Sequence, residues 1–223
     1  MRDISFVIRA HNEERWVGHA IQSVLDIFGN KTQINVVYHQ STDDTLDVIK
    51  LFGKSFYNIN VLSIDEKIYR PGLALNHGIS FCNTDVVGIL SSHCEIIAAD
   101  KEKILKYFDD DKCFGVMGKQ IPIYRGKKIT PRYIWKNFAE STVKKNILED
   151  DGDTKRPFFH NAFSFIKKQP IWFENKFNET LSGKEDRYWA KDLCDMGLYF
   201  WFDPDIKCQH HWTPAGATWS GIG

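Results

Sequence analysis

The 223-residue chain is long enough for one large α/β domain with a substantial core, or for two small domains. Lysine plus arginine and aspartate plus glutamate both number 29, so net charge gives no reason to expect a nucleic-acid or membrane-surface binder. The five cysteines form no CxxC pair, which argues against a disulfide framework or zinc finger and fits a reducing cytosol. No secretory leader or run of about 18 apolar residues is present, so we expect no integral membrane protein, while docking to a membrane-bound partner stays open.

The first half of the sequence alternates short apolar runs with amphipathic segments. Residues 4–8 predict a strand, and the apolar residues between Val17 and Phe28 recur with the spacing of one helical face. Helices are expected after Ser41–Asp44 and from Pro71. Such alternation predicts right-handed crossovers and a mostly parallel sheet. Further strands are expected at residues 34–38, 60–64 and 86–90.

The second half is less regular. Residues 118–149 are rich in charged and aromatic side chains and show no clear period, and the tail from His210 is expected to lack regular structure. The acidic run Glu149–Asp153 is interpreted as an exposed, mobile loop rather than a site. Helices are expected at residues 101–108 and 184–196, the latter ending at Gly197, and strands at 114–117, 162–166 and 198–202.

The stretch Asp85–Glu95 joins a buried strand to polar side chains. Residues 86–90 are apolar and rich in β-branched side chains, as in a central strand of a parallel sheet. Open α/β sheets bind ligands beyond the carboxyl ends of their strands, so His93 and Glu95 would stand where chemistry is expected. A plain polar turn leaving a core strand is the alternative interpretation.

Several segments, taken in order, resemble the signatures of family 2 glycosyltransferases, over about residues 4 to 212. They are Ser5–Glu14, Ser41–Thr45, Gly72–Gly78, Asn161–Ala162, Trp172, Phe177–Asp186, Trp189–Ala190 and His210. The resemblance implies a single GT-A domain of α/β class with a mostly parallel mixed sheet. It implies a nucleotide-sugar-binding half at residues 1–118, an acceptor-binding catalytic half at 119–212 and a tail at 213–223. The implied activity is transfer of a sugar from an activated donor to a hydroxyl, with inversion and a divalent cation.

The metal-binding signature of the family differs in this chain. Its usual Asp-x-Asp after the fourth strand reads Ser91-Ser92-His93 here, which resembles a Ser-x-His subgroup of the family. The resemblance makes His93 and His210 the candidate metal ligands. An imidazole suits Mn²⁺ better than Mg²⁺, so Mn²⁺ is favoured. A hydrogen-bonded structural histidine is the alternative at either position.

Two adjacent carboxylates at a predicted helix start are the catalytic candidates. By resemblance, Asp186 takes the proton of the acceptor hydroxyl, and Glu185 orients the acceptor or holds the turn. Repulsion between neighbouring carboxylates favours protonation while the helix dipole opposes it, so one of them could be poised as a base. A cap of the first helical turn is the alternative.

Nucleotide recognition departs most from the family pattern. Tyr38, His39 and Gln40 stand where many relatives carry an acidic pair; Tyr38 is a candidate to stack on a base, and His39 or Gln40 to hydrogen-bond its edge. Asp43 is assigned to a ribose, a phosphate or a helix cap, and Arg70 or Arg9 to the charge of the phosphates. The remaining donor-site candidates, taken from the resemblance, are Ala10, Asn12, Glu13, Gly72, Asn76, Ser91, Ser92, Lys119 and Asn161.

Aromatic residues concentrate in the second half, where they suit an acceptor groove because their faces stack on sugar rings. Most are expected in the core, with one or two meeting substrate. They are Trp135, Phe138, Phe158, Phe159, Trp172 and Trp189.

Three hypotheses follow. The leading one is an inverting glycosyltransferase that uses a nucleoside-diphosphate-sugar and a glycan or lipid-linked acceptor in bacterial surface polysaccharide synthesis. It would act in the cytoplasm, with peripheral association at the inner membrane face and a homodimer left open, and without nucleic acid. The alternative is a degenerate GT-A domain that binds sugar or nucleotide, or partners an active subunit, because both acidic signatures are altered. A nucleotidyltransferase is disfavoured because no GxxxxGK[ST] loop occurs.

Overall fold

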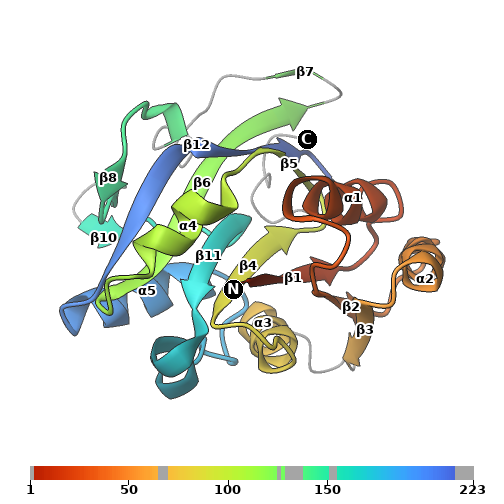
Figure 1. Ribbon diagram of the computed structural model, residues 1–223, viewed down its shortest axis with the longest axis horizontal. Coiled ribbons are helices and arrows are strands. Elements are labelled where there is room, and N and C mark those ends of the chain that lie inside the picture. The colour runs from red at the N-terminus through yellow and green to blue at the C-terminus, as the bar shows by residue number, and fades with distance from the viewer. Residues whose placement is uncertain (1–2, 65–69, 125–126, 129–137, 151–154, 214–223) are drawn as a thin grey trace.

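The computed structural model describes residues 3–64, 70–124, 127–128, 138–150 and 155–213. Their backbone forms a mixed α/β fold around one large, strongly twisted sheet (Figure 1). Trp135, the acidic residues 151–153 and the tail beyond residue 213, all singled out in the sequence, lie outside the described residues.

The elements follow the expected alternation in the first half of the chain. The strands are β1 (Ile4–Ala10), β2 (Ile34–His39), β3 (Ile59–Ile64), β4 (Val86–Ser91), β5 (Cys94–Ala98), β6 (Cys113–Tyr124), β7 (Lys127–Lys128), β8 (Lys144–Lys145), β9 (Leu148–Asp150), β10 (Lys155–Pro157), β11 (Phe163–Lys167) and β12 (Tyr199–His211). The helices are α1 (Val17–Phe28), α2 (Thr45–Ser55), α3 (Pro71–Ser80), α4 (Lys101–Tyr107), α5 (Glu185–Asp195) and the π-helical turn η3 (Lys168–Trp172).

The main sheet has the strand order β3-β2-β1-β4-β11-β6-β12-β5. Strands β1 to β4 pair in parallel, and β6 pairs in parallel with β12. Strands β11 and β5 run antiparallel to their neighbours. The predicted mostly parallel mixed sheet is therefore confirmed, and the parallel strands bring their carboxyl ends to one edge.

Helices cover both faces of this sheet. Alternate residues of β1 separate the two sides: Phe6 and Ile8 pack with α1 in one core cluster, whereas Val7 packs with α3 in the other. Helix α4 adds to the first layer, and α5 with η3 adds to the second. Both faces of the sheet are therefore buried, and the ends of its strands are the parts of the sheet where a ligand can bind.

Two strands are longer than predicted. Strand β6 continues past Met117 to Tyr124, and β12 continues past Phe202 to His211. The sequence around Pro204 looks like a turn, but the strand passes it with a register shift and resumes pairing with β6 at Lys207. The prediction that the tail from His210 is irregular was therefore wrong for His210 and His211.

Strand β5 was not predicted at all. Residues Ser92 and His93 form a turn directly after β4, and the chain then enters β5 at Cys94 and pairs with β12. Glu95, expected at the strand end with His93, lies within β5 instead, and its side chain is 40% exposed. Of the pair His93 and Glu95, only His93 therefore lies in the turn at the carboxyl edge.

The described aromatic residues of the second half lie in the core. Phe138, Phe158, Phe159, Trp172 and Trp189 are each less than 5% exposed and belong to the cluster beneath α3 and α5. None of these five rings is available to stack on an acceptor sugar. Of the six aromatic residues singled out in the sequence, Trp135 lies outside the described residues.

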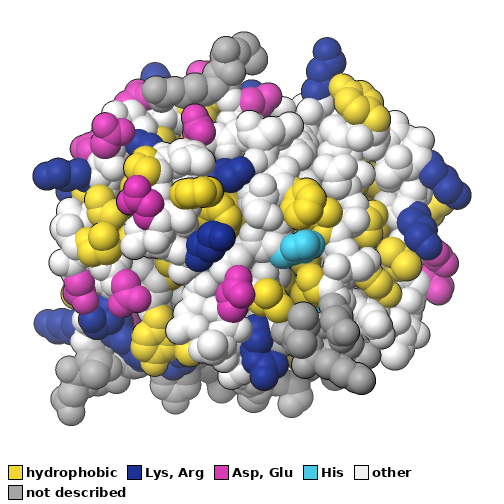
Figure 2. Space-filling view, turned by 90° about the horizontal axis from the view of Figure 1, so that it is seen from below, with side chains coloured by type: hydrophobic (Ala, Val, Ile, Leu, Met, Phe, Trp, Pro, Cys, Tyr) yellow, Lys and Arg dark blue, Asp and Glu magenta, His cyan; other side chains and the backbone are white. Residues whose placement is uncertain are grey.

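Charges of both signs lie close together on one face of the molecule (Figure 2). Acidic and basic side chains are interspersed over the face seen in Figure 2, in agreement with the equal numbers of the two kinds in the sequence. None of the helices in the described ranges is long and apolar enough to cross a membrane.

Candidate active site

The carboxyl ends of the parallel strands open onto a hollow beside the first turn of α5. Arg9 lies near the end of β1 and Ser91 ends β4, and both line this hollow of about 340 Å³. Ligands of open α/β sheets bind at this edge. The other lining residues are Pro71, Glu149, His160, Asn161, Ala162, Ser182, Gly183, Lys184, Glu185, Asp186 and Arg187. Five residues that the sequence singled out thus lie together: Arg9, Ser91, Asn161, Glu185 and Asp186.

The two carboxylates at the start of α5 are buried. Lys184 just before them takes a left-handed conformation, with φ of 59°, and turns the chain into the helix. Glu185 is 5% exposed and Asp186 is 8% exposed. Asp186 accepts hydrogen bonds from the backbone N–H groups of Asn161 (3.0 Å) and Arg187 (2.8 Å). These bonds fix the Asp186 carboxylate at the rim of the hollow.

Glu185 differs from Asp186 in its partners. Its Oε1 atom lies 3.4 Å from Nη1 of Arg9 across the hollow. Burial raises the pKa of Glu185, and the neighbouring charge of Asp186 raises it further, while the charge of Arg9 opposes both effects. The hollow therefore holds a carboxyl group that retains its proton more readily than an exposed glutamate does.

Arg187 and Glu149 form a buried ion pair behind Asp186. The Arg187 side chain donates from Nη1 to Glu149 Oε1 at 2.9 Å and from Nε to the Phe159 carbonyl at 2.8 Å. Its guanidinium also lies 4.1 Å from the centre of the Phe158 ring. The interpretation of the acidic run as exposed was wrong for Glu149, which is 6% exposed and lines the hollow, because an arginine nearly 40 positions away compensates its charge.

His93 and His210 are neighbours at the strand ends. Their ring centres lie 4.9 Å apart with an interplanar angle of 31°. His93 Nδ1 lies 2.8 Å from Glu13 Oε1, and Glu13 Oε2 is buried without a hydrogen bond to any described residue. Burial lowers the pKa of His210 well below its usual value, and the nearby His93 lowers it further. His210 is therefore held as the neutral imidazole that metals bind.

The residues around His93 fit a divalent cation only as a partial donor set. Within the described ranges, no three His, Cys, Asp or Glu side chains enclose a point where a metal ion could sit. The two imidazoles suit an ion that takes its other ligands from a diphosphate and water. A hydrogen bond from the second ring nitrogen to a carboxylate, as between His93 and Glu13, is the usual outer support of a metal-binding histidine.

The predicted nucleotide loop is braced by its own polar atoms. Asn12 accepts at Oδ1 from the Thr42 N–H at 2.8 Å, and the Tyr38 hydroxyl accepts from the Ser41 N–H at 2.9 Å. Asp43 accepts from Thr45 N–H and hydroxyl and from Glu14 N–H. Burial would raise the pKa of Asp43, but these hydrogen bonds outweigh it and lower the pKa. Asp43 stands one residue before Asp44, the N-cap of α2, so these contacts brace the loop that leads into the helix.

Tyr38 and His39 point to opposite sides of β2. Tyr38 packs against the core cluster that includes α1, whereas the His39 ring lies 4.5 Å from the ring of His11. His39 is 8% exposed. Tyr38 is only partly buried, so part of its side chain stays accessible beside that core contact.

Gly72 and Asn76 join α3 to the second half of the chain. A Cβ atom on Gly72 would collide with the backbone carbonyl of Asn178, so only glycine allows this approach. The Asn76 amide donates to Phe177 O and Glu179 Oε1 and accepts from Trp172 Nε1 and Phe177 N–H. Both residues thereby support the segment that leads to Glu185.

The other predicted donor-site residues are spread along the same edge. Ala10 ends β1 and Ser92 lies in the turn after β4, both buried. Arg70 precedes α3 and is exposed, and Lys119 donates from Nζ to the Glu140 carbonyl at 3.3 Å. None of these four is among the residues that line the hollow.

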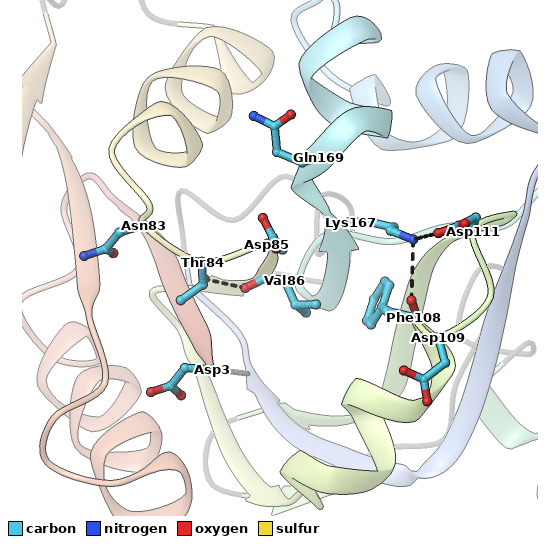
Figure 3. Close-up of a pocket in the computed structure, with 10 residues that line it drawn as sticks. All are labelled: Asp3, Asn83, Thr84, Asp85, Val86, Phe108, Asp109, Asp111, Lys167 and Gln169. Atoms are coloured by element: carbon cyan, nitrogen blue, oxygen red, sulfur yellow. Dashed lines mark hydrogen bonds and ion pairs between the residues drawn. The ribbon is translucent and has the colours of Figure 1, made fainter. Parts of the chain in front are cut away.

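A larger hollow of about 570 Å³ lies at the opposite end of the sheet (Figure 3). It sits beside the amino ends of β1 and β4, where Asp3 and Asp85 line it, and beside the end of β11, where Lys167 pairs with Asp111 at 2.7 Å. Its four lining aspartates are all exposed. By strand direction it lies away from the edge where α/β sheets bind ligands.

The backbone is similar to those of solved glycosyltransferases. The structure of Staphylococcus aureus TarS residues 1–349 has a TM-score of 0.65 at 17% identity, covering 94% of this chain and 60% of that one. The Pyrobaculum calidifontis mannosyltransferase PcManGT, solved with GDP-Man and Mn²⁺, has a TM-score of 0.68 at 16% identity, with 97% and 59% covered. GalNAc-T7, solved with UDP, GalNAc and Mn²⁺, has a TM-score of 0.73 at 15% identity, with 97% and 45% covered. These similarities define a GT-A fold, and the chain spans about 60% or less of each neighbour's length.

The family follows from the sequence match. Residues 5–173 match the profile of glycosyl transferase family 2, which is more than half of the chain. The chain therefore belongs to glycosyl transferase family 2. No curated protein matches it in sequence.

Proposed function

We propose that this domain is an inverting glycosyltransferase that moves a sugar from a nucleoside-diphosphate-sugar to a hydroxyl of a glycan or lipid-linked acceptor. The observation that carries the proposal is the convergence of Arg9, Ser91 and the buried Glu185–Asp186 pair on one hollow at the carboxyl edge of a GT-A sheet. Family membership sets the class of reaction. The buried carboxylates supply the group that such a reaction needs at the acceptor side.

Asp186 is the proposed base. Its carboxylate, held by the N–H groups of Asn161 and Arg187, takes the proton of the acceptor hydroxyl while that oxygen bonds to the anomeric carbon and the diphosphate leaves. Glu185 and Arg9 orient the acceptor from the other side of the hollow. Asn161 adds a donor, since its Nδ2 is buried without a hydrogen bond to any described residue and can bind a sugar hydroxyl.

His93 and His210 are the proposed ligands of a divalent cation, with Mn²⁺ favoured. Such a cation would supply positive charge against the leaving diphosphate. The Ser91-Ser92-His93 sequence then takes the place of the family's Asp-x-Asp, as in a Ser-x-His subgroup. Support comes from the neutral His210, the Glu13 contact of His93 and the Mn²⁺ in two of the similar structures.

The division of labour follows the resemblance. Residues 1–118 are assigned to the nucleotide-sugar and residues 119–212 to the acceptor, with Asn12, Tyr38, His39, Asp43, Arg70 and Lys119 kept as donor-site candidates. The biological setting proposed is bacterial surface polysaccharide synthesis at the cytoplasmic face of the membrane, with association to that face and a homodimer both open.

A catalytically degenerate domain is the second candidate. It is favoured by one observation: the polar atoms of Asn12, Tyr38 and Asp43 that would meet a nucleotide are engaged in hydrogen bonds within their own loop. Such a domain would bind a sugar or nucleotide, or an active partner subunit, without turnover.

A donor panel separates these functions. The wild-type chain is incubated with UDP-, GDP-, TDP- and CMP-linked sugars, with Mn²⁺ or with EDTA, and nucleotide release is followed together with calorimetric binding. Turnover that needs Mn²⁺ supports the transferase. Tight donor binding that ignores Mn²⁺ and gives no release would replace it with the degenerate domain.

A further inference from the structure

Gln120 links His210 to a third histidine through its side-chain amide. Gln120 on β6 and His210 on β12 are both buried, at 1% and 0% exposed. Gln120 Oε1 lies 2.7 Å from His210 Nδ1, and Gln120 Nε2 lies 3.1 Å from His160 Nδ1. The amide thus spans two imidazoles that are 50 positions apart in the sequence.

A backbone N–H group determines the direction of the hydrogen bonds that join His210, Gln120 and His160. The Ala162 N–H donates to His160 Nδ1 at 3.1 Å, so that nitrogen carries a lone pair and cannot also carry a proton. The amide of Gln120 must then turn its NH₂ group toward His160, because the opposite orientation would set its oxygen against the same lone pair. Gln120 Oε1 therefore faces His210 and accepts a hydrogen bond from its Nδ1–H.

The result is a defined tautomer for His210. With the proton on Nδ1, its Nε2 carries the lone pair. His93 has the equivalent arrangement, because its Nδ1 donates to the Glu13 carboxylate at 2.8 Å. Two neighbouring rings with centres 4.9 Å apart thus each direct Nδ1–H to an oxygen and keep Nε2 as an electron-pair donor. This is the arrangement by which outer partners orient metal-binding histidines.

The same short segment also holds the proposed base. His160 and Ala162 flank Asn161, whose N–H donates to Asp186 Oδ2 at 3.0 Å. Residues 160–162 therefore contact Asp186 on one side and, through Gln120, His210 on the other. One rigid connection sets the position of a carboxylate and of an imidazole that the reaction needs at a fixed separation.

We propose that Gln120 is a positioning residue that holds His210 in the Nδ1–H tautomer and so presents Nε2 as a ligand for a divalent cation. The inference rests on the proposed function in which His93 and His210 bind that cation. His160 acts one step behind Gln120 by orienting its amide.

The first test measures Mn²⁺ alone, by titration calorimetry and electron paramagnetic resonance, on wild type, Gln120→Leu and Gln120→Glu. Gln120→Leu removes the acceptor, and Mn²⁺ affinity is expected to fall about 10–100-fold. Gln120→Glu keeps an acceptor for His210 Nδ1–H, and its second oxygen, when protonated, can donate to His160 Nδ1 as the amide NH₂ does, so it is expected to retain affinity better than Gln120→Leu. If Gln120 only supported the fold, Gln120→Glu would lose more Mn²⁺ affinity than Gln120→Leu, because burying a carboxylate costs more free energy than burying a leucine.

A matched control comes from the opposite end of the sheet. Gln33 also bridges segments, accepting from Ser5 Oγ and donating to the Phe81 carbonyl. Gln33→Leu is expected to lower stability without changing Mn²⁺ affinity. An equal loss of affinity in Gln33→Leu would overturn the assignment of Gln120.

The second test reads the tautomer directly in metal-free protein. Long-range ¹H–¹⁵N spectra distinguish protonated from lone-pair ring nitrogens, and wild type is expected to show Nδ1–H for His210. This test needs only the wild-type protein, so it applies even if Gln120→Leu does not fold. An Nε2–H signal for His210 would overturn the inference alone. If wild type binds no Mn²⁺ at all, the proposed metal site fails and the inference fails with it; if wild type binds and Gln120→Leu binds equally well, only the inference fails.

Discussion

The two ends of the central sheet carry hollows of different character. The larger one, about 570 Å³ at the amino ends of β1 and β4, is lined by exposed aspartates such as Asp111, whose side chain is 98% exposed (Figure 3). The smaller one, about 340 Å³ at the carboxyl ends, holds Glu149, Glu185 and Asp186, each 8% exposed or less. Burying a charge is costly unless it is paired, so a fold keeps buried charges where their positions are used. Buried charge, rather than volume, marks the candidate site in this molecule.

The largest expected difference between the two ends is in catalysis. Asp186→Asn is expected to lower kcat by about 10²–10⁴-fold, because a neutral amide cannot take the acceptor's proton. The same change at the other end, Asp111→Asn, is expected to leave kcat unchanged. Rates of nucleotide release at saturating donor measure both. Near-wild-type turnover in Asp186→Asn would remove Asp186 as the base.

The basic residues Arg187 and Lys167, one at each end of the sheet, should differ in how much their ion pairs stabilise the fold. Among the described residues, Arg187→Met leaves the buried Glu149 with a longer contact to Arg156, and we expect a loss of about 3–5 kcal/mol in the free energy of unfolding. Lys167→Met breaks a pair with the exposed Asp111 and should cost less than about 1 kcal/mol. Urea unfolding of the two variants gives the comparison. Equal losses would mean that burial does not distinguish the two pairs.

The first and second halves of the chain also differ in how much of the structure the sequence alone could predict. The periodic apolar residues of β1, α1 and β4 gave element boundaries within a residue or two, because period and burial agree there. The strands β6 and β12 were predicted too short, since polar residues such as Gln120 and His210 lie inside them at the site. Buried polar residues interrupt the apolar pattern at functional positions.

The candidate site was only partly accessible to sequence reasoning. Glu185, Asp186 and Asn161 were named from the family pattern, and their roles remain proposals. Glu149 and Arg187 were missed because their pairing is a contact across 38 positions that no local pattern shows. The position of Arg187 directly after two acidic residues at a helix start was the available signal. His160, beside Asn161, was missed because its contact with Gln120 also joins positions far apart in the sequence.

Acid should destabilise the carboxyl end selectively. Burial lowers the pKa of His160 to about 4, although Asp186 opposes the shift. The unfolded chain therefore binds a proton that the folded chain excludes between about pH 6.5 and pH 4, and stability falls as pH falls through that window, by at most about 1.4 kcal/mol per pH unit. The hollow at the opposite end has no histidine in its lining.

Two histidine variants test this dependence. His160→Gln is expected to give a shallower decline of unfolding free energy between pH 6.5 and 4, measured by urea denaturation. His19→Gln changes an exposed residue and should keep the wild-type slope. An unchanged slope in His160→Gln would assign the acid sensitivity to other groups.

The smallest expected effect concerns the stability contributed by Glu185. Because burial and then Asp186 raise its pKa, folding favours the protonated carboxyl: the associated stability is present below about pH 4.5 and is lost as pH rises through the folded-state pKa. Glu185→Gln mimics the protonated form and should raise Tm by about 2–4 °C at pH 8, or about 1 kcal/mol, with little gain at pH 4. Asp85→Asn in the exposed hollow should leave Tm unchanged at both pH values. A fall of Tm in Glu185→Gln at pH 8 would mean that the ion pair with Arg9 stabilises the fold by more than the burial of the Glu185 charge costs. The buried carboxylate would then be a net stabilising group at the carboxyl end of the sheet.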